Sequence, residues 1–301
     1  MKYYIAKGTD FNYDLEWVMQ KLGRKYSVKM ISCKYWDNAD FVWKIIPKGI
    51  DLDSIVTLKY FNNFHTDITT KIGLLRTGLE CMGEDFFNYH PHSIKYNGEV
   101  SQFPSIIKLS DGFGGQDIHV VFNHEQLYRL DLHGKEYIIQ RYISRPKLYN
   151  GRKFDIRAYV LLTKDEIYLH TFAFARVAPS LYREVDTDPS ITLTNICLEG
   201  EAASLHDVNV DFSTIHSLVK DIKGVFVLAQ RDEQDRKYNP FDLLGLDIIL
   251  DENGKAWLLE INKDPAFCSK KGGVFNGIPI MLEDILSLVI FGENSIRLLS
   301  V

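Results

Sequence analysis

Residues 241–266, FDLLGLDIILDENGKAWLLEINKDPA, predict a β-hairpin. The runs LDIIL and AWLLEI have the composition of strands, and the Asn-Gly pair at 253–254 has the residue types that tolerate positive φ in a tight turn. If that pair forms the loop, Asp247 faces Glu260 across the hairpin. Asn262 then shares a face with Glu260, because side chains alternate with period two along a strand. A four-residue loop shifts the pairing by two and leaves the three groups on one face.

Two carboxylates that face each other in a sheet repel, and the surrounding Ile, Leu and Trp side chains would screen them poorly. Two interpretations are open. Asp247 and Glu260 are either paired with Arg or Lys residues from elsewhere in the chain, or they hold a divalent cation together with Asn262. A set of oxygen ligands without Cys or His favours Mg²⁺ or a similar hard ion.

The composition is typical of a soluble globular protein, with 46% apolar and 25% charged residues in a chain of 301. This length suffices for one large domain or two to three small ones. A net charge of −5 provides no field for nucleic acid or an anionic membrane, so we expect neither as a partner. An acidic peptide substrate would need a local basic groove.

Targeting and redox signals favour the cytoplasm. The first ten residues, MKYYIAKGTD, lack the apolar core of a secretory signal, and the run IPIMLEDILSLVIF is charged and too short to cross a bilayer. The four cysteines (Cys33, Cys81, Cys197 and Cys268) are widely spaced, which predicts reduced thiols.

Residues 1–65 predict a small N-terminal α/β domain. Strands are expected over 2–6 and 27–33, and between them the apolar residues of 11–22 have helical spacing. Further helices are predicted over 66–82, 123–132, 211–231 and 278–291.

Residues 105–121 predict a strand, a glycine-rich loop and a second strand, with Lys108 at the end of the first strand. Gly112, Gly114 and Gly115 allow unusual backbone angles. Such a loop can bring backbone N–H groups close to a phosphate, and a plain hairpin turn would use the same residues. Both interpretations remain open from the residues alone.

Residues 151–157, GRKFDIR, open a charged strand. Lys153, Asp155 and Arg157 alternate on one face of it, which indicates either the lining of a cleft or a solvated strand face. The His-Pro-His sequence at 90–92 is interpreted as structural, because no third metal ligand is evident.

Three blocks carry a resemblance to a known family. In chain order these are IIQRYISRPKLYNGRKFDIRAYVLLT at 138–163, LTN at 193–195 and FDLLGLDII…WLLEIN within 241–262. They resemble blocks that occur in the same order in the tubulin-tyrosine-ligase-like family. The similarity runs from about residue 66 to 267. It implies a mixed α/β (α+β) protein with the ATP-grasp fold, in which the nucleotide lies between a central lobe, 66–143, and a C-terminal lobe, 144–301.

The resemblance implies a set of site residues. Arg157 and Arg176 would stabilise the reacting phosphoryl group, and Glu260 would be both catalytic and a metal ligand. The metal ligands implied are Asp247, Glu260 and Asn262. The nucleotide contacts implied are Lys71, Lys108, Gly114, Gly115, Gln140, Tyr142, Ile143, Lys153, Asp155, Thr194 and Asn195. For Lys71, a lysine on the surface of its helix is the alternative.

The implied reaction is an ATP-dependent ligation that uses two Mg²⁺ ions, for which Mn²⁺ can substitute. A carboxylate would form an acyl-phosphate, and an amine would then form an amide, so that tyrosine, glutamate or glycine is joined to a protein or peptide acceptor such as tubulin. A monomeric, cytoplasmic enzyme is expected. The alternatives are another ATP-grasp ligase or a kinase-like phosphotransferase acting on a small molecule, an inactive ATP-binding adaptor, and a purely structural protein.

Overall fold

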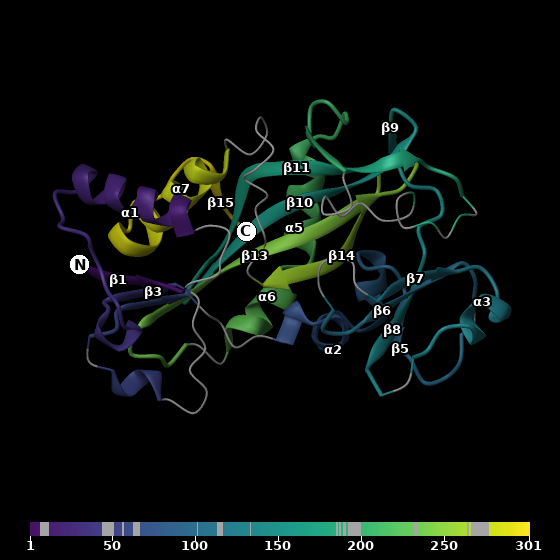
Figure 1. Cartoon of the computed structure of the whole chain (residues 1–301), viewed down its shortest axis with the longest axis horizontal. Helices are drawn as coiled ribbons and strands as arrows, with labels where there is room; N and C mark the ends of the chain where they lie inside the picture. Colours follow the sequence, from purple (N-terminus) through teal and green to yellow (C-terminus); the bar gives the residue numbers. More distant parts are fainter. Residues whose placement is uncertain are drawn as a thin grey trace.

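The structure is a computed structural model of the chain. It describes residues 1–6, 12–43, 51–55, 57–62, 67–100, 102–112, 117–132, 134–184, 186, 188, 191, 200–231, 234–263, 265 and 277–301. In these residues the chain forms an 11-stranded sheet and a four-stranded sheet with α-helices packed around them, a mixed α/β architecture as predicted (Figure 1).

The larger sheet has the strand order β12–β11–β10–β13–β4–β3–β1–β2, and β14, β15 and β9 pair with β13, β11 and β10. The strands are β1 (Lys2–Ile5), β2 (Ile31–Ser32), β3 (Phe41–Trp43), β4 (Tyr60–Asn62), β9 (Leu148–Tyr149), β10 (Arg152–Thr163), β11 (Ile167–Leu181), β12 (Glu201–Ser204), β13 (Asn239–Leu250), β14 (Ala256–Lys263) and β15 (Leu298–Ser300). The long central strands β10 and β13 are buried almost throughout, which suits their continuous apolar sequences.

The N-terminal segment begins with the predicted strand, helix and strand. Its helix α1 (Asn12–Lys25) follows β1, and β2, β1, β3 and β4 lie side by side and parallel. Strand β4 pairs in turn with Asn239–Phe241 of β13, also in parallel. The N-terminal strands therefore extend the larger sheet, and the Phe41 and Phe241 rings pack across this junction at 5.7 Å. The boundary at residue 65 remains a prediction.

The smaller sheet has the order β5–β8–β6–β7. Its strands are β5 (Ser93–Lys95), β6 (Ser105–Leu109), β7 (Ile118–Val121) and β8 (Tyr137–Arg141), and α2 (Lys71–Met82) and α3 (His124–Tyr128) accompany it. Asn123 caps α3 as predicted, since its side chain accepts a hydrogen bond from the Gln126 N–H. The sheet encloses a small apolar core of its own that includes Ile107, Val121 and Leu127.

The turn of the β13–β14 hairpin differs from the prediction. Among the described residues Gly254 has a φ of +81°, whereas Asn253 is not in the left-handed region. The Asp251 N–H donates to the Lys255 carbonyl at 3.0 Å. Residues 252–254 therefore form a three-residue loop instead of a two-residue turn, because glycine alone supplies the positive φ.

A second irregularity restores the predicted pairing. The longer loop places Ile248 opposite Leu258, one position away from the predicted register. A β-bulge then inserts Leu259, and beyond it Asp247 pairs with Glu260. The prediction that these two acids face each other is confirmed, although the turn on which it rested is wrong.

The remaining helices cover the larger sheet. Helices α5 (Phe212–Asp221) and α6 (Lys223–Gln230) meet at Ile222, where one continuous helix was expected, and α7 (Gly277–Phe291) matches the predicted closing helix. Helix α5 contacts β11 and β14, α6 contacts β10, and α7 contacts α1 and β11. Within the described ranges, none of the helices has the length and apolar character needed to cross a membrane.

Candidate active site

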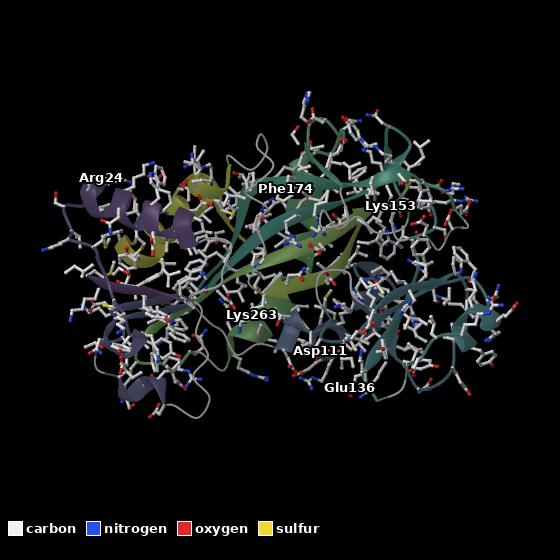
Figure 2. All side chains as sticks on the ribbon, in the orientation of Figure 1. Arg24, Asp111, Glu136, Lys153, Phe174 and Lys263 are labelled. Carbon is white, nitrogen blue, oxygen red and sulfur yellow. The ribbon has the colours of Figure 1, made fainter. Side chains whose placement is uncertain are left out.

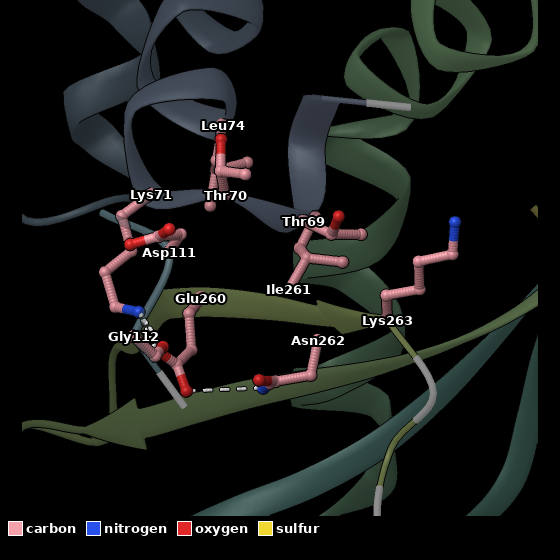
Figure 3. A pocket seen from close by; sticks show the side chains of 10 residues that line it. All are labelled: Thr69, Thr70, Lys71, Leu74, Asp111, Gly112, Glu260, Ile261, Asn262 and Lys263. Atoms are coloured by element: carbon pink, nitrogen blue, oxygen red, sulfur yellow. Dashed lines mark hydrogen bonds and ion pairs between the residues drawn. The ribbon is translucent and has the colours of Figure 1, made fainter. Parts of the chain in front are cut away.

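The predicted acidic face of the hairpin is present. The Asn262 amide nitrogen lies 3.1 Å from a carboxylate oxygen of Asp247 and 3.3 Å from one of Glu260. Asp247 is buried and Glu260 is partly exposed. The three side chains predicted as metal ligands therefore converge on one face of β13 and β14, where Figure 3 shows Glu260 and Asn262 side by side.

Two arginines from the neighbouring strands close on the acids. Arg157 of β10 is the register partner of Asp247 and donates to it from Nε at 2.7 Å. Arg176 of β11 donates to both oxygens of its own register partner, Asp155, at 2.7 and 2.6 Å and lies 2.8 Å from Asp247. Burial disfavours the charge on Asp247, but Arg157 and Arg176 outweigh it and hold the pKa of Asp247 below its ordinary value.

Both interpretations of the paired acids thus retain support. Each acid has a basic partner, as the ion-pair interpretation required. Arg157 contacts Asp247, and Lys71 lies 3.5 Å from Glu260. The two carboxylates also converge on the Asn262 amide, which turns its nitrogen toward both and would have to present its oxygen instead to ligate a cation. Within the described residues no group of three or more Asp, Glu, His or Cys side chains could hold a metal ion. Two carboxylates and one amide fit a hard cation whose remaining ligands are water or phosphate oxygens.

The smaller sheet and its helix supply two lysines. Thr70 caps α2, and Lys71 at the start of that helix donates to the Gly112 carbonyl at 2.8 Å. Lys108 on β6 donates to the Gln140 side-chain oxygen at 2.9 Å. Burial lowers the pKa of Lys108 to about 8, although nearby acids, Glu260 foremost, oppose this. Lys71 is buried, so the alternative of a surface lysine is wrong.

Lys153 and Tyr142 form a second buried pair. The Lys153 ammonium donates to the Tyr142 hydroxyl at 3.1 Å and lies 4.4 Å from the centre of its ring. Burial lowers the pKa of Lys153 to about 7 and raises that of Tyr142 well above its ordinary value. Ile143 follows directly and is partly exposed. Figure 2 shows Lys153 on the larger sheet, and Asp111 and Glu136 beside the smaller sheet.

A small pocket of about 120 Å³ lies where the start of α2 faces β14 (Figure 3). Its lining includes Lys71, Gly112, Glu260 and Asn262. Since α2 accompanies the smaller sheet and β14 belongs to the larger one, the pocket has a wall from each.

The charges of the assembled residues suit a polyanion. Lys71, Lys108, Lys153, Arg157 and Arg176 outnumber Asp155, Asp247 and Glu260, and all except Glu260 are buried. A surplus of buried positive charge is costly unless a ligand neutralises it, and phosphate oxygens would do so. The two faces predicted separately from GRKFDIR and from the hairpin therefore form one cluster, so Lys153, Asp155 and Arg157 do not form a solvated face.

Four of the predicted residues, Gly114, Gly115, Thr194 and Asn195, lie outside the described residues. Two other residues, which were not predicted as site residues, contact members of the cluster. His90 bonds to Gln140 in the interior. Gly245 leaves room for Arg157, since an added Cβ would lie 3.2 Å from the arginine and 2.6 Å from Pro265. A lone glycine inside a strand is the signal that could have found it.

Comparisons with known proteins identify the family of this chain. A sequence profile described as the tubulin-tyrosine ligase family matches residues 79–213 and 209–296, well over half of the chain. The chain is 30% identical over 182 residues to the Homo sapiens protein named inactive polyglycylase TTLL10, which covers 51% of this chain and 27% of the relative. It is 29% identical over 231 residues to the Caenorhabditis elegans probable tubulin polyglutamylase ttll-9, and this match covers 64% of this chain and 55% of the relative.

A third relative is the Schizosaccharomyces pombe probable tubulin–tyrosine ligase C12B10.04, at 30% identity over 189 residues, 58% of this chain and 45% of the relative. The chain spans about a quarter to about half the length of these curated relatives. The profile match includes β6, β8, β10 and β13, which carry most of the residues described above. By this match the chain belongs to the tubulin-tyrosine ligase family.

Proposed function

We propose that this protein is an ATP-dependent ligase of the ATP-grasp type that joins an amino acid to a protein acceptor, with tubulin as the first acceptor to test. The nucleotide would lie between the smaller sheet and the larger one. The observation that carries the proposal is the buried cluster at this junction, where Lys71 contacts Glu260 while Arg157 and Arg176 contact Asp247. Lys108 and Lys153 are buried in the same cluster and interact with its acids.

The proposed reaction needs no protein nucleophile. A carboxylate oxygen attacks the γ-phosphorus of ATP, the bond to the ADP oxygen breaks, and an acyl-phosphate forms. The amine of the second substrate then attacks the acyl carbon, loses a proton and displaces inorganic phosphate, which leaves an amide. Positioning and charge neutralisation must supply the catalysis.

The residues of the cluster divide that work. Arg157 and Arg176 can each hold two oxygens in a planar fork, which suits the transferring phosphoryl group and the carboxylate. Lys71 and Lys108 would contact the phosphates as compact charges, and Lys153 would lie nearer the nucleoside. Asp247, Glu260 and Asn262 would hold Mg²⁺, which would supply positive charge to neutralise the phosphate oxygens.

The test is incubation of the purified chain with ATP, Mg²⁺, tubulin and labelled tyrosine, glutamate or glycine in turn. Covalent labelling seen by mass spectrometry, together with ADP release, would support the proposal. ADP release with amines or polyols alone would favour a small-molecule reaction. ATP binding without ADP release under any acceptor would indicate an adaptor, an outcome to which the word inactive in one relative's name draws attention. A chain that binds no ATP would refute the proposal.

Glu260→Gln provides the sharpest variant. We expect it to lower turnover by about 100-fold or more, because the carboxylate charge is lost where phosphate charge must be balanced. Its circular dichroism and melting temperature should remain close to those of the wild type. Glu252→Gln is the matched control, since Glu252 lies in the loop of the same hairpin and is half exposed. Full activity of Glu260→Gln with Mg²⁺ would remove the proposed role.

A further inference from the structure

A buried histidine connects the two sides of the site. His90 precedes β5, is 1% exposed and stacks on Phe86 with ring centres 5.1 Å apart. Its Nδ1 lies 2.8 Å from the carbonyl oxygen of Leu258 on β14, two residues before Glu260. Its Nε2 lies 3.0 Å from the side-chain nitrogen of Gln140 on β8.

The directions of these hydrogen bonds follow from the groups involved. The Leu258 carbonyl can only accept, so Nδ1 of His90 carries the proton. Burial, reinforced by the charge of Lys108, lowers the pKa of His90 to about 3, so the ring is neutral and its Nε2 is an acceptor. Nε2 therefore takes a hydrogen from the Gln140 amide nitrogen.

This arrangement orients the Gln140 amide. With its nitrogen held toward His90, its oxygen faces the Lys108 ammonium at 2.9 Å. Ser93 reinforces the same orientation, because its hydroxyl donates to the Pro91 carbonyl at 2.7 Å and accepts from the Gln140 nitrogen at 3.1 Å. A reversed amide would place its NH₂ group against the ammonium of Lys108, and two donors would oppose each other.

We propose that His90 is a positioning residue for Lys108 and acts through Gln140. The relay fixes a lysine of the smaller sheet relative to the hairpin that carries Glu260. The Leu258 N–H also donates to the Tyr89 carbonyl at 2.8 Å. Tyr89 and His90, which are adjacent in the chain, therefore both bond to Leu258 of β14. This inference rests on the proposed function, in which Lys108 contacts the phosphates of ATP.

A histidine that only filled the core would not be arranged in this way. The stacking on Phe86 needs an aromatic ring but no nitrogen, so phenylalanine would serve it. Both nitrogens of His90 are instead engaged with residues that border the cluster. Lysine has a flexible four-carbon stem, and an acceptor held in one place reduces the ordering that ATP binding would otherwise require.

The experiment compares His90→Phe with the wild type in direct binding of ATP and of adenosine. The substitution keeps the stacked ring and removes both hydrogen bonds. We expect ATP to bind about 10-fold more weakly, the effect of losing one hydrogen bond to a charged group. Adenosine should bind unchanged, because it lacks phosphates. A structural role alone would weaken both ligands in parallel.

Two further substitutions separate the relay from folding. His92→Phe is the matched control, because His92 is an exposed histidine of the same loop whose ring contacts Phe87, and it should change neither affinity. Gln140→Met breaks the relay in its middle and should weaken ATP binding at least as much as His90→Phe does, which keeps the test decisive if His90→Phe does not fold. His90→Gln, which retains an acceptor, should recover part of the affinity.

A double-mutant cycle completes the test. In a Lys108→Met background, His90→Phe should weaken ATP binding no further, because the group it positions is gone. Additive losses, or unchanged ATP affinity in both His90→Phe and Gln140→Met, would overturn the positioning role and leave the proposed ligase intact. A wild-type chain that binds no ATP would overturn both.

Discussion

Lys153 carries a buried charge whose cost depends on pH. Its pKa falls from the ordinary 10.5 to about 7 because of burial, which Asp155 opposes only in part. Between about pH 7 and 10, the unfolded chain holds a proton on this lysine that the folded chain has released. Stability therefore rises with pH through this window, and the full cost of burial is present below about pH 7.

Replacing this lysine should stabilise the fold. We expect Lys153→Met to raise the melting temperature at pH 6.5 relative to the wild type, and this gain should shrink toward pH 10. ATP affinity should fall in the same variant if the lysine serves the nucleotide. Melting curves at both pH values measure the first effect, with the exposed Lys59→Met as the control. A lower melting temperature at pH 6.5 would show that the charge stabilises the fold.

Individual residues also show how far a sequence can locate a site. Asp247, Glu260 and Asn262 could be predicted because alternation along two adjacent strands fixes their face. The contact of Arg176 with Asp155 and Asp247 could not be derived from spacing, because it depends on the pairing of β11 with β10. His90 was interpreted as a structural loop residue. Its link to Gln140 joins residues 50 positions apart, which no local pattern reveals.

At the scale of elements, the β13–β14 hairpin shows why a correct conclusion can follow from a wrong local detail. The Asn-Gly pair predicted a two-residue turn, whereas a three-residue loop and a bulge at Leu259 produce the same pairing of Asp247 with Glu260. A bulge depends on the twist and packing of the whole sheet, so the sequence of one hairpin does not specify it.

One buried acid adds polar contacts to the apolar packing of helix α7 against the sheet. Asp284 accepts a hydrogen bond from His170 of β11 at 3.0 Å and two from Arg297, which precedes β15, at 2.6 and 2.7 Å. Burial alone would raise the pKa of Asp284, but these donors lower it to about 2. The stabilisation is therefore complete above about pH 4 and is lost as the pH falls toward 2.

Asp284→Asn should weaken this attachment. We expect the free energy of unfolding at pH 7 to fall by about 2 kcal/mol, as for the loss of hydrogen bonds to a charged group. The difference from the wild type should narrow between pH 4 and 2, where the wild-type carboxylate takes up its proton. Urea denaturation measures both values. Glu283→Gln is the control, because its pair with Lys21 is partly exposed and should contribute less than about 1 kcal/mol. An equal loss in the two variants would contradict the argument.

At the scale of the whole molecule, the N-terminal segment is joined to the rest of the chain by a shared sheet. Strand β4 covers the edge of β13 at Asn239–Phe241, and Trp43 packs against Phe241 at 5.6 Å. On the other side, α1 lies against α7, where Tyr26 stacks on Phe291 at 3.9 Å. The sequence predicts a small α/β domain because this strand–helix–strand pattern is self-contained, and that division stays a prediction. The pairing of β4 with β13 could not be predicted, because it joins segments far apart in the sequence.

Removal of residues 1–62 should therefore expose the edge of β13 and the apolar face of α7 together. We expect the remaining chain to aggregate or to lose cooperative unfolding, because an unpaired edge and an uncovered apolar face both promote association. Size-exclusion chromatography and thermal denaturation of the truncated and full chains measure this, and co-expression with a 1–62 fragment should restore some soluble complex. A truncated chain that is monomeric and protects the β13 amides from hydrogen exchange as the full chain does would show that the N-terminal segment is an independent domain. In that case the cluster around Asp247 would be held by the two sheets without it, and truncation would leave ATP binding unchanged.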